Sequence, residues 1–137
     1  IAFPGRFDIL ATDYNHAALR ELAKQFPSVK TLHTDLENTD IWPFVGHDFD
    51  VVMVTNYLFR PRLADLFQLI RNGGFLAYET FANGNGAYGR PSNPNFLLND
   101  GELPACLPDD FKILDYFHGK VDQPKPAIIQ RLAAKRH

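Results

Sequence analysis

The pattern of hydrophobic and polar residues along the chain predicts strands that alternate with helices, followed by two strands in succession. Apolar runs rich in β-branched and aromatic residues are typical of strands, and they cover 7–13, 29–36, 49–58, 74–81, 111–118 and 127–133. The run at 49–58 is the most continuous, which predicts a strand buried on both faces.

Two of the segments between these strands have apolar residues near helical spacing. The first begins after Asn15, a residue that favours the N-cap, and Pro27 ends it. The second passes through Leu63, Leu66, Phe67 and Ile70, and Asn72-Gly73-Gly74 is expected to end it. The order of elements predicts an α/β protein, a Rossmann-like three-layer sandwich with a mainly parallel sheet and an antiparallel C-terminal strand pair.

Composition narrows the functional classes. The 137 residues correspond to a single domain, and the net charge of −2 does not favour nucleic acid or an anionic membrane as a partner. No apolar run is long enough for a membrane span. The one cysteine, Cys106, fits a reducing compartment, so we expect a cytoplasmic protein. The five histidines show no metal-ligand spacing, so no metal site is expected. The oligomeric state stays open.

The letters GNGAYG at 84–89 match the dinucleotide-binding pattern G-x-G-x-x-G. That pattern binds a pyrophosphate only where a helix begins directly after it. Here Arg90-Pro91-Ser92-Asn93-Pro94 follows, and its two prolines disfavour a helix. We therefore do not expect a cofactor loop at this position.

Polar residues follow several of the predicted strands. Parallel sheets bind ligands at the carboxyl ends of their strands, which is where Asp13, Asp35, Asn56 and Glu79 are expected. A carboxylate at such an end can accept hydrogen bonds from both hydroxyls of a ribose. Asp13 could instead be a helix cap or a turn residue, Asp35 a solvated turn residue, and Glu79 a member of an ordinary ion pair.

The chain resembles the class I S-adenosylmethionine-dependent methyltransferases, and it is most similar to small bacterial members of the tellurite-resistance type. The segments that carry the resemblance are ILATDYN, HTDLEN, FDVVMVTNYLFRPRL and RNGGFLAYETF, together with the closing strand pair. The resemblance starts at the second strand of the family. The family's first strand and its glycine-rich loop have no counterpart here, and residues 1–5 look like the end of the helix after that loop.

The resemblance implies S-adenosylmethionine as cofactor and a small molecule as methyl acceptor. It places the cofactor against Asp13, Tyr14, Asp35, Leu36 and Asn56, with Asp13 at the ribose and Asp35 and Leu36 at the adenine. Candidate catalytic residues are Tyr57 and Glu79; these two residues and Arg90 are the candidates for acceptor binding.

Two other functions stay open. A nicotinamide-dependent oxidoreductase would also use an acid such as Asp13 to hold a ribose, and a non-catalytic α/β module would keep the fold without a working site. The absent first strand would leave two neighbouring strands without backbone partners. We therefore expect 1–137 to be a single methyltransferase-like domain that is incomplete at its N-terminus.

Overall fold

The computed structural model describes residues 6–38 and 40–137. Residues 1–5, expected to end a helix, lie outside the described residues. The chain divides into two compact units, Ile1–Val45 and Gly46–His137. The following paragraphs treat each unit by itself.

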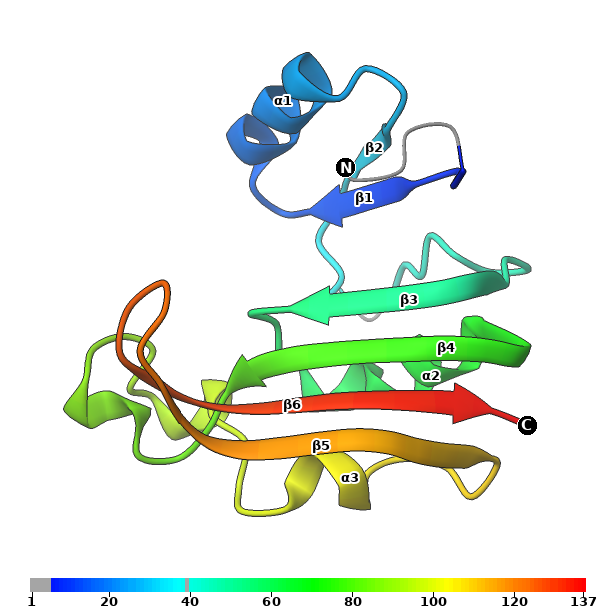
Figure 1. The fold of residues 1–137 in the computed structure, drawn as a ribbon. Helices are drawn as coiled ribbons and strands as arrows, with labels where there is room; N and C mark the ends of the chain where they lie inside the picture. The colour runs from blue at the N-terminus through cyan, green and yellow to red at the C-terminus, as the bar shows by residue number, and fades with distance from the viewer. Residues whose placement is uncertain (1–5, 39) are drawn as a thin grey trace. The chain divides into compact units, whose positions relative to one another are not determined.

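The first unit contains two parallel strands and one helix, β1 (Leu10–Asp13), α1 (His16–Gln25) and β2 (Lys30–His33) (Figure 1). As the sequence predicts, Asn15 caps α1, and its side chain accepts a hydrogen bond from the Ala18 amide at 3.1 Å. Leu19 is the buried residue of α1. The helix connection makes β1 and β2 parallel, so their carboxyl ends lie at the same edge of this small sheet.

The second unit is built on a four-stranded sheet of order β3-β4-β6-β5. The strands are β3 (Phe49–Thr55), β4 (Ile70–Phe81), β5 (Phe111–Val121) and β6 (Ala127–Arg136). Between them lie the helices α2 (Leu63–Gln68) and α3 (Glu102–Ala105), and the 3₁₀ turns η1 (Arg60–Arg62), η2 (Asn85–Ala87) and η3 (Pro94–Phe96).

The prediction of a mainly parallel sheet is confirmed only in part. β3 and β4 are parallel, but β6 lies antiparallel to both β4 and β5. This mixture follows from the hairpin of β5 and β6, because its second strand, β6, lies between β4 and β5. The closing antiparallel pair was predicted, and it is confirmed.

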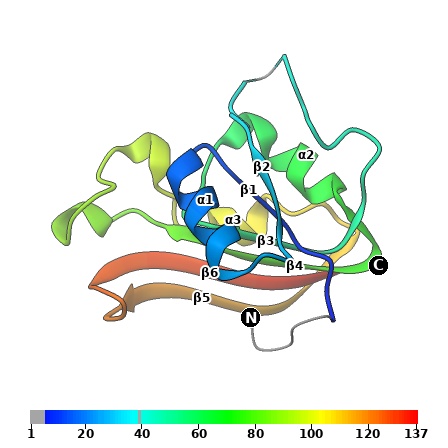
Figure 2. The ribbon, with the colours of Figure 1, turned by 90° about the horizontal axis from the view of Figure 1, so that it is seen from above.

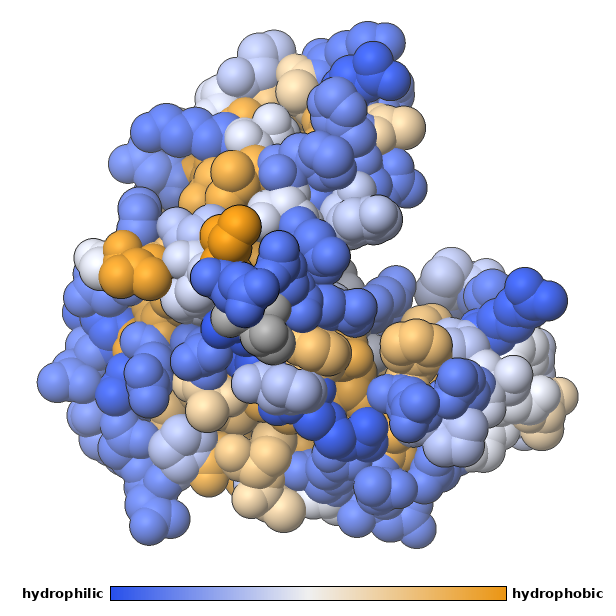
Figure 3. Space-filling view, turned by 180° about the vertical axis from the view of Figure 1, so that it is seen from behind, coloured by the Kyte–Doolittle hydropathy of each residue, from blue (hydrophilic) through white to orange (hydrophobic). Residues whose placement is uncertain are grey.

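Helices cover one face of this four-stranded sheet. Figure 2 shows α2 and α3 on the same side of the strands. Alternate residues of β4, among them Leu76, Tyr78 and Thr80, are buried, as expected for a strand with one covered face. Within Gly46–His137 no helix covers the opposite face, so this unit alone does not show three layers. From behind the view of Figure 1, hydrophobic residues reach the surface in several places between hydrophilic ones (Figure 3).

The prediction that the run at 49–58 forms a strand buried on both faces is wrong. β3 ends at Thr55 and lies at the edge of its sheet, where it pairs with β4. The side chains of Val51 and Met53 are 44% and 73% exposed, because they project from the face without helices.

The end of the second helix also differs from the prediction. α2 ends at Gln68, and Ile70 already pairs with Phe49 as the first residue of β4. Asn72-Gly73-Gly74 therefore lies inside a strand. A Cβ on Gly74 would lie 2.8 Å from the Asp50 carbonyl oxygen of β3, so the glycine permits a close strand approach.

Candidate functional site

Asp13 is the last residue of β1, at the strand end where ligands bind in parallel sheets. Its Oδ1 accepts a hydrogen bond from the Asn15 amide at 2.9 Å. That bond holds the carboxylate at the turn into α1, and the side chain is exposed. Oδ2 has no partner among the described residues, so an oxygen remains that can accept hydrogen bonds from a ligand.

The ends of β1 and β2 are joined by the Thr34 amide, which donates to the Asp13 carbonyl at 3.2 Å. Tyr14, which follows Asp13, is 72% exposed. Its carbonyl lies 2.9 Å from Nε2 of His33, and the His33 ring stacks on His16 with 4.8 Å between centroids. The predicted cofactor side of this unit therefore presents a carboxylate next to exposed rings.

Asp35 and Leu36 lie just beyond β2. The Asp35 carboxylate is exposed and accepts a hydrogen bond from the Glu37 amide at 3.0 Å, which defines a local turn. Leu36 is half-buried. The structure thus places these two residues in the same unit as Asp13 and Tyr14, after the carboxyl ends of two adjacent parallel strands.

Asn56 directly follows β3 and has a left-handed backbone conformation, with φ of 52°. Asparagine tolerates this conformation better than most residues, and such turns are common at binding sites. Its amide donates to the Glu79 carbonyl at 3.0 Å, which joins the ends of β3 and β4. The neighbouring Tyr57 accepts a hydrogen bond at its carbonyl from the buried Tyr78 hydroxyl at 2.6 Å. Burial raises the pKa of Tyr78, so this phenol stays protonated and keeps donating.

Glu79 forms an ion pair across two strands. Its Oε2 accepts a hydrogen bond from Nε of Arg131 at 2.6 Å, and the two residues face each other in the register of β4 and β6. The Arg131 guanidinium also lies over the Phe117 ring at 5.9 Å. This is the ordinary ion pair that the sequence left open as an alternative to a catalytic role.

Arg90, the remaining predicted residue, lies in the second unit on the segment between η2 and η3. The structure thus places the candidates in two groups. Asp13, Tyr14, Asp35 and Leu36 belong to the first unit, and Asn56, Tyr57, Glu79 and Arg90 belong to the second.

The 84–89 motif is an exposed loop that is fixed by one buried side chain, Asn85. Gly84 has φ of +98°, and the turn that follows is the three-residue η2, so no helix N-terminus faces outward. Asn85 is 1% exposed. Its Oδ1 accepts from the Ile128 amide at 3.0 Å, and its Nδ2 donates to the Pro91 carbonyl at 2.9 Å. The expectation that no cofactor helix follows this motif is confirmed.

Sequence reasoning missed a polar network around the segment 99–103. Arg60 donates from Nε and Nη2 to the two carboxylate oxygens of Glu102, at 2.7 and 2.8 Å. These hydrogen bonds hold the pKa of Glu102 below its usual range and raise the pKa of Arg60. Gln130, fully buried, bonds to the Asn99 carbonyl, the Leu103 amide and the Tyr116 hydroxyl. The one available signal was the glutamine inside the apolar run of β6.

The described residues offer no other recognisable centre of chemistry. Burial raises the pKa of the Cys106 thiol to about 11, which disfavours the nucleophilic thiolate. Among residues 6–38 and 40–137, no three His, Cys, Asp or Glu side chains gather in a way that could hold a metal ion. In the same part of the chain, no helix is long and apolar enough to cross a membrane.

Neither a protein-family profile nor a curated protein sequence matches the chain. Solved structures do match its fold. TehB from Haemophilus influenzae aligns with a TM-score of 0.70 and 16% identity, over 96% of this chain and 51% of TehB. This chain thus spans about half the length of TehB.

Two further solved structures are methyltransferases. The N-methyltransferase NodS from Bradyrhizobium japonicum aligns with a TM-score of 0.68 and 10% identity, over 94% of this chain and 73% of NodS. A SAM-dependent methyltransferase from Methanosarcina mazei gives a TM-score of 0.63 and 15% identity, over 94% of this chain and 82% of that protein. Together with the strand orders, the acid at the end of β1 and the closing antiparallel pair, these alignments show that the chain has the fold of the class I S-adenosylmethionine-dependent methyltransferases.

Proposed function

We propose that this chain takes part in S-adenosylmethionine-dependent methyl transfer to a small-molecule acceptor. The observation that carries the proposal is the Asp13 carboxylate, held by the Asn15 amide at the carboxyl end of β1 with one oxygen left free. The solved structures of similar fold support methyl transfer as the reaction class.

The residues of the first unit fit the adenosine part of the cofactor. Asp13 has a free carboxylate oxygen for the ribose hydroxyls, and a charged acceptor forms stronger hydrogen bonds than a neutral one. Exposed Tyr14 and half-buried Leu36 offer apolar surface to the adenine, and Asp35 offers an acceptor for its amino group. For the methionine part, the described residues of this unit offer no glycine-rich cradle after a strand.

In the second unit, Asn56 and Tyr57 are the proposed residues at the reacting centre. When bound, the cofactor supplies an electrophilic methyl group on a positively charged sulfur. The left-handed backbone conformation of Asn56 turns the chain away from the end of β3. Carbonyl and aromatic groups at this turn can then face the positively charged sulfur of the cofactor. Glu79 enters this proposal as the partner of Arg131, since its carboxylate is already held in an ion pair. The chain then acts by positioning the methyl donor against the methyl acceptor. Positioning alone can supply a large share of the rate acceleration of a group transfer.

Calorimetric titration with S-adenosylhomocysteine tests the role of Asp13. The most informative variant is Asp13→Asn, because its amide oxygen can still accept from the Asn15 amide and preserve the turn. Loss of the charge should weaken binding by about 10-fold, and Asp13→Ala by about 10- to 150-fold, as for hydrogen bonds to charged groups.

The matched control is Asp8→Ala, which removes the same charge from an exposed position before β1. Its affinity should stay within about twofold of the unmodified chain, because the carboxylate lies at the opposite end of the strand. Equal affinities for Asp13→Ala and Asp8→Ala would refute the assignment of Asp13. Absence of any S-adenosylhomocysteine binding by the natural full-length protein at millimolar ligand would refute the proposed cofactor.

A further inference from the structure

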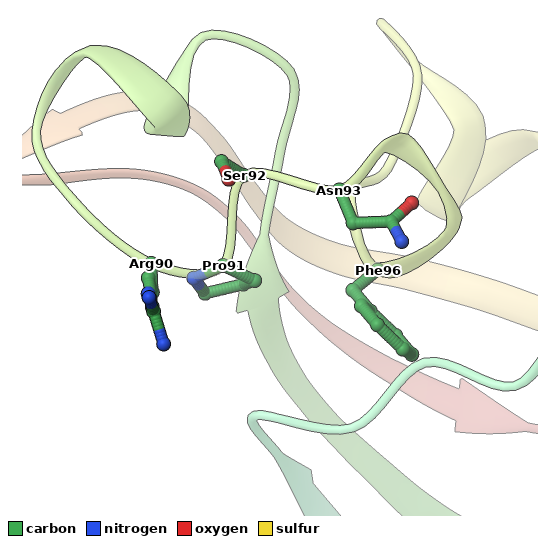
Figure 4. Close-up of a pocket in the computed structure, with 5 residues that line it drawn as sticks. All are labelled: Arg90, Pro91, Ser92, Asn93 and Phe96. Carbon is green, nitrogen blue, oxygen red and sulfur yellow. The ribbon is translucent and has the colours of Figure 1, made fainter.

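A hollow of about 400 Å³ lies on the segment that follows β4, lined by Arg90, Pro91, Ser92, Asn93 and Phe96. The side chains of Arg90 and Phe96 extend to the same side of this segment (Figure 4). The segment leaves the carboxyl end of β4, the strand whose Glu79 carbonyl is bonded to Asn56. The hollow therefore belongs to the edge of the sheet where ligands bind in this class of fold.

Side-chain hydrogen bonds from buried Asn85 and from exposed Arg60 fix the backbone on both sides of the hollow. On the Arg90 side, the amide of Asn85 holds the Pro91 carbonyl at 2.9 Å. On the Phe96 side, the guanidinium of Arg60 donates to the carbonyls of Asn95 and Leu97, at 3.3 and 2.9 Å. A rim fixed in this way loses little conformational entropy when a ligand binds.

The hollow carries a positive charge, that of the Arg90 guanidinium. Arg90 is exposed and has no hydrogen bond or ion pair with the described residues, and no acidic residue occurs between Ala82 and Phe96. Two other cations recorded against this part of the chain already have acidic partners: Arg60 binds Glu102 at 2.7 Å, and Lys120, which lies 5.3 Å from the centre of the Tyr88 ring, lies 3.3 Å from Asp122. A free guanidinium is suited to a carboxylate, which it can bind through two parallel hydrogen bonds.

The other end of the hollow is apolar. The Phe96 ring is 49% exposed, although the neighbouring Leu97 and Leu98 are buried. The hollow thus combines a free cation with an exposed aromatic surface and with two small polar residues, Ser92 and Asn93.

We propose that this hollow binds the methyl acceptor, and that the acceptor is a small organic carboxylate with an aromatic or aliphatic body. This inference rests on the proposed function, because it assigns the occupant as the acceptor. Arg90 binds the carboxylate and Phe96 packs against the body.

Titration of the ¹⁵N-labelled 137-residue chain with sodium benzoate tests the hollow independently of the cofactor. Benzoate should shift the amide signals of Ser92 and Asn93 with a millimolar dissociation constant, an order-of-magnitude value for so small a ligand. Benzamide, with the same shape and no charge, should bind about fivefold or more weakly. The benzoate affinity should also fall between low salt and about 0.3 M salt, because Arg90 is exposed.

Three variants locate the binding. Arg90→Gln should lower the benzoate affinity to that of benzamide, and Phe96→Ala should weaken both ligands alike. Arg20→Gln removes an exposed charge from α1 and should change neither. Benzoate shifts that stay unchanged in Arg90→Gln, or that equal those caused by benzamide, would overturn the proposal.

Titrations with the two ligands separate the two proposals. Retained S-adenosylhomocysteine binding with no benzoate binding would overturn the carboxylate inference and leave the proposed function standing. Benzoate binding at Arg90 without S-adenosylhomocysteine binding by the natural full-length protein would overturn the proposed function, and with it the identity of the occupant as an acceptor.

Discussion

Gln130 is the buried polar residue whose replacement gives the sharpest test of the second unit. It is 0% exposed, and its Nε2 donates to the Asn99 carbonyl at 2.7 Å. Its Oε1 accepts from the Leu103 amide at 3.2 Å and from the Tyr116 hydroxyl at 3.0 Å. One side chain on β6 therefore satisfies groups on β5, on α3 and on the turn before α3.

Gln130→Leu keeps the volume close to that of glutamine and removes all of these hydrogen bonds. The Leu103 amide and the Asn99 carbonyl then lose their partner, at a cost of about 1–3 kcal/mol for each buried group. The Tyr116 hydroxyl belongs to a half-buried residue and can turn to water. We expect the free energy of unfolding to fall by about 2–5 kcal/mol, measured by urea denaturation with far-UV circular dichroism.

Gln130→Glu tests the hydrogen-bond donor at this position, because it replaces the side-chain amide by a carboxyl group of nearly the same shape. The new carboxyl must be protonated to donate to the Asn99 carbonyl, so burial and this acceptor raise its folded pKa above the unfolded value of about 4.3. A raised folded pKa means that the variant is most stable below pH 4.3 or so and loses stability as pH rises toward the folded pKa. The loss approaches about 1.4 kcal/mol per pH unit within that interval.

Gln123→Glu, at an exposed position between β5 and β6, is the matched control and should show no such slope. A difference between the two variants that stays constant from pH 5 to 8 would refute the hydrogen-bond network.

Two further predictions concern the groups with shifted pKa values. Cys106, with a pKa of about 11, should react with iodoacetamide roughly 100-fold more slowly in the folded chain than in urea at pH 8, by mass spectrometry; equal rates would contradict its burial. Glu102→Gln should cost about 1–2 kcal/mol at pH 7, because it removes the charge that Arg60 binds. Since the pKa of Glu102 is lowered in the folded state, this stabilisation is present above about pH 4.3 and is lost as pH falls further. The variant and the unmodified chain should therefore converge toward pH 3 in urea denaturation, and a difference that persists there would argue against the ion pair.

The sequence predicted the existence of all six strands, because each needs a local run of apolar residues. Strand ends were predicted less well where a neighbouring strand decides them. β4 begins at Ile70 instead of Gly74, because Ile70 pairs with Phe49 and the glycine fits against the Asp50 carbonyl. Both interactions join positions far apart in the chain, and a local turn signal such as Asn-Gly-Gly cannot report them.

The burial of β3 was overestimated for a related reason. A β-branched run shows that a strand can be buried, but its place in the sheet decides whether it is. β3 pairs only with β4 among the described residues, and Met53 is exposed on a face that no helix of its unit covers. Strand order depends on the whole topology, so the sequence of one strand does not contain it.

The candidate site likewise has features that the sequence predicts and features that it does not. The position of Asp13 at a strand end could be predicted, because the apolar run of β1 stops there and Asn15 begins the next element. The partner of Glu79 could not, since Arg131 lies 52 residues away and meets it only through the register of β4 and β6. That register also distinguishes the two acids chemically. Each carboxylate has one recorded partner, but the charge of Glu79 is offset by the Arg131 guanidinium, whereas Asp13 is held by a neutral backbone amide and keeps its charge at the edge where ligands bind in parallel sheets.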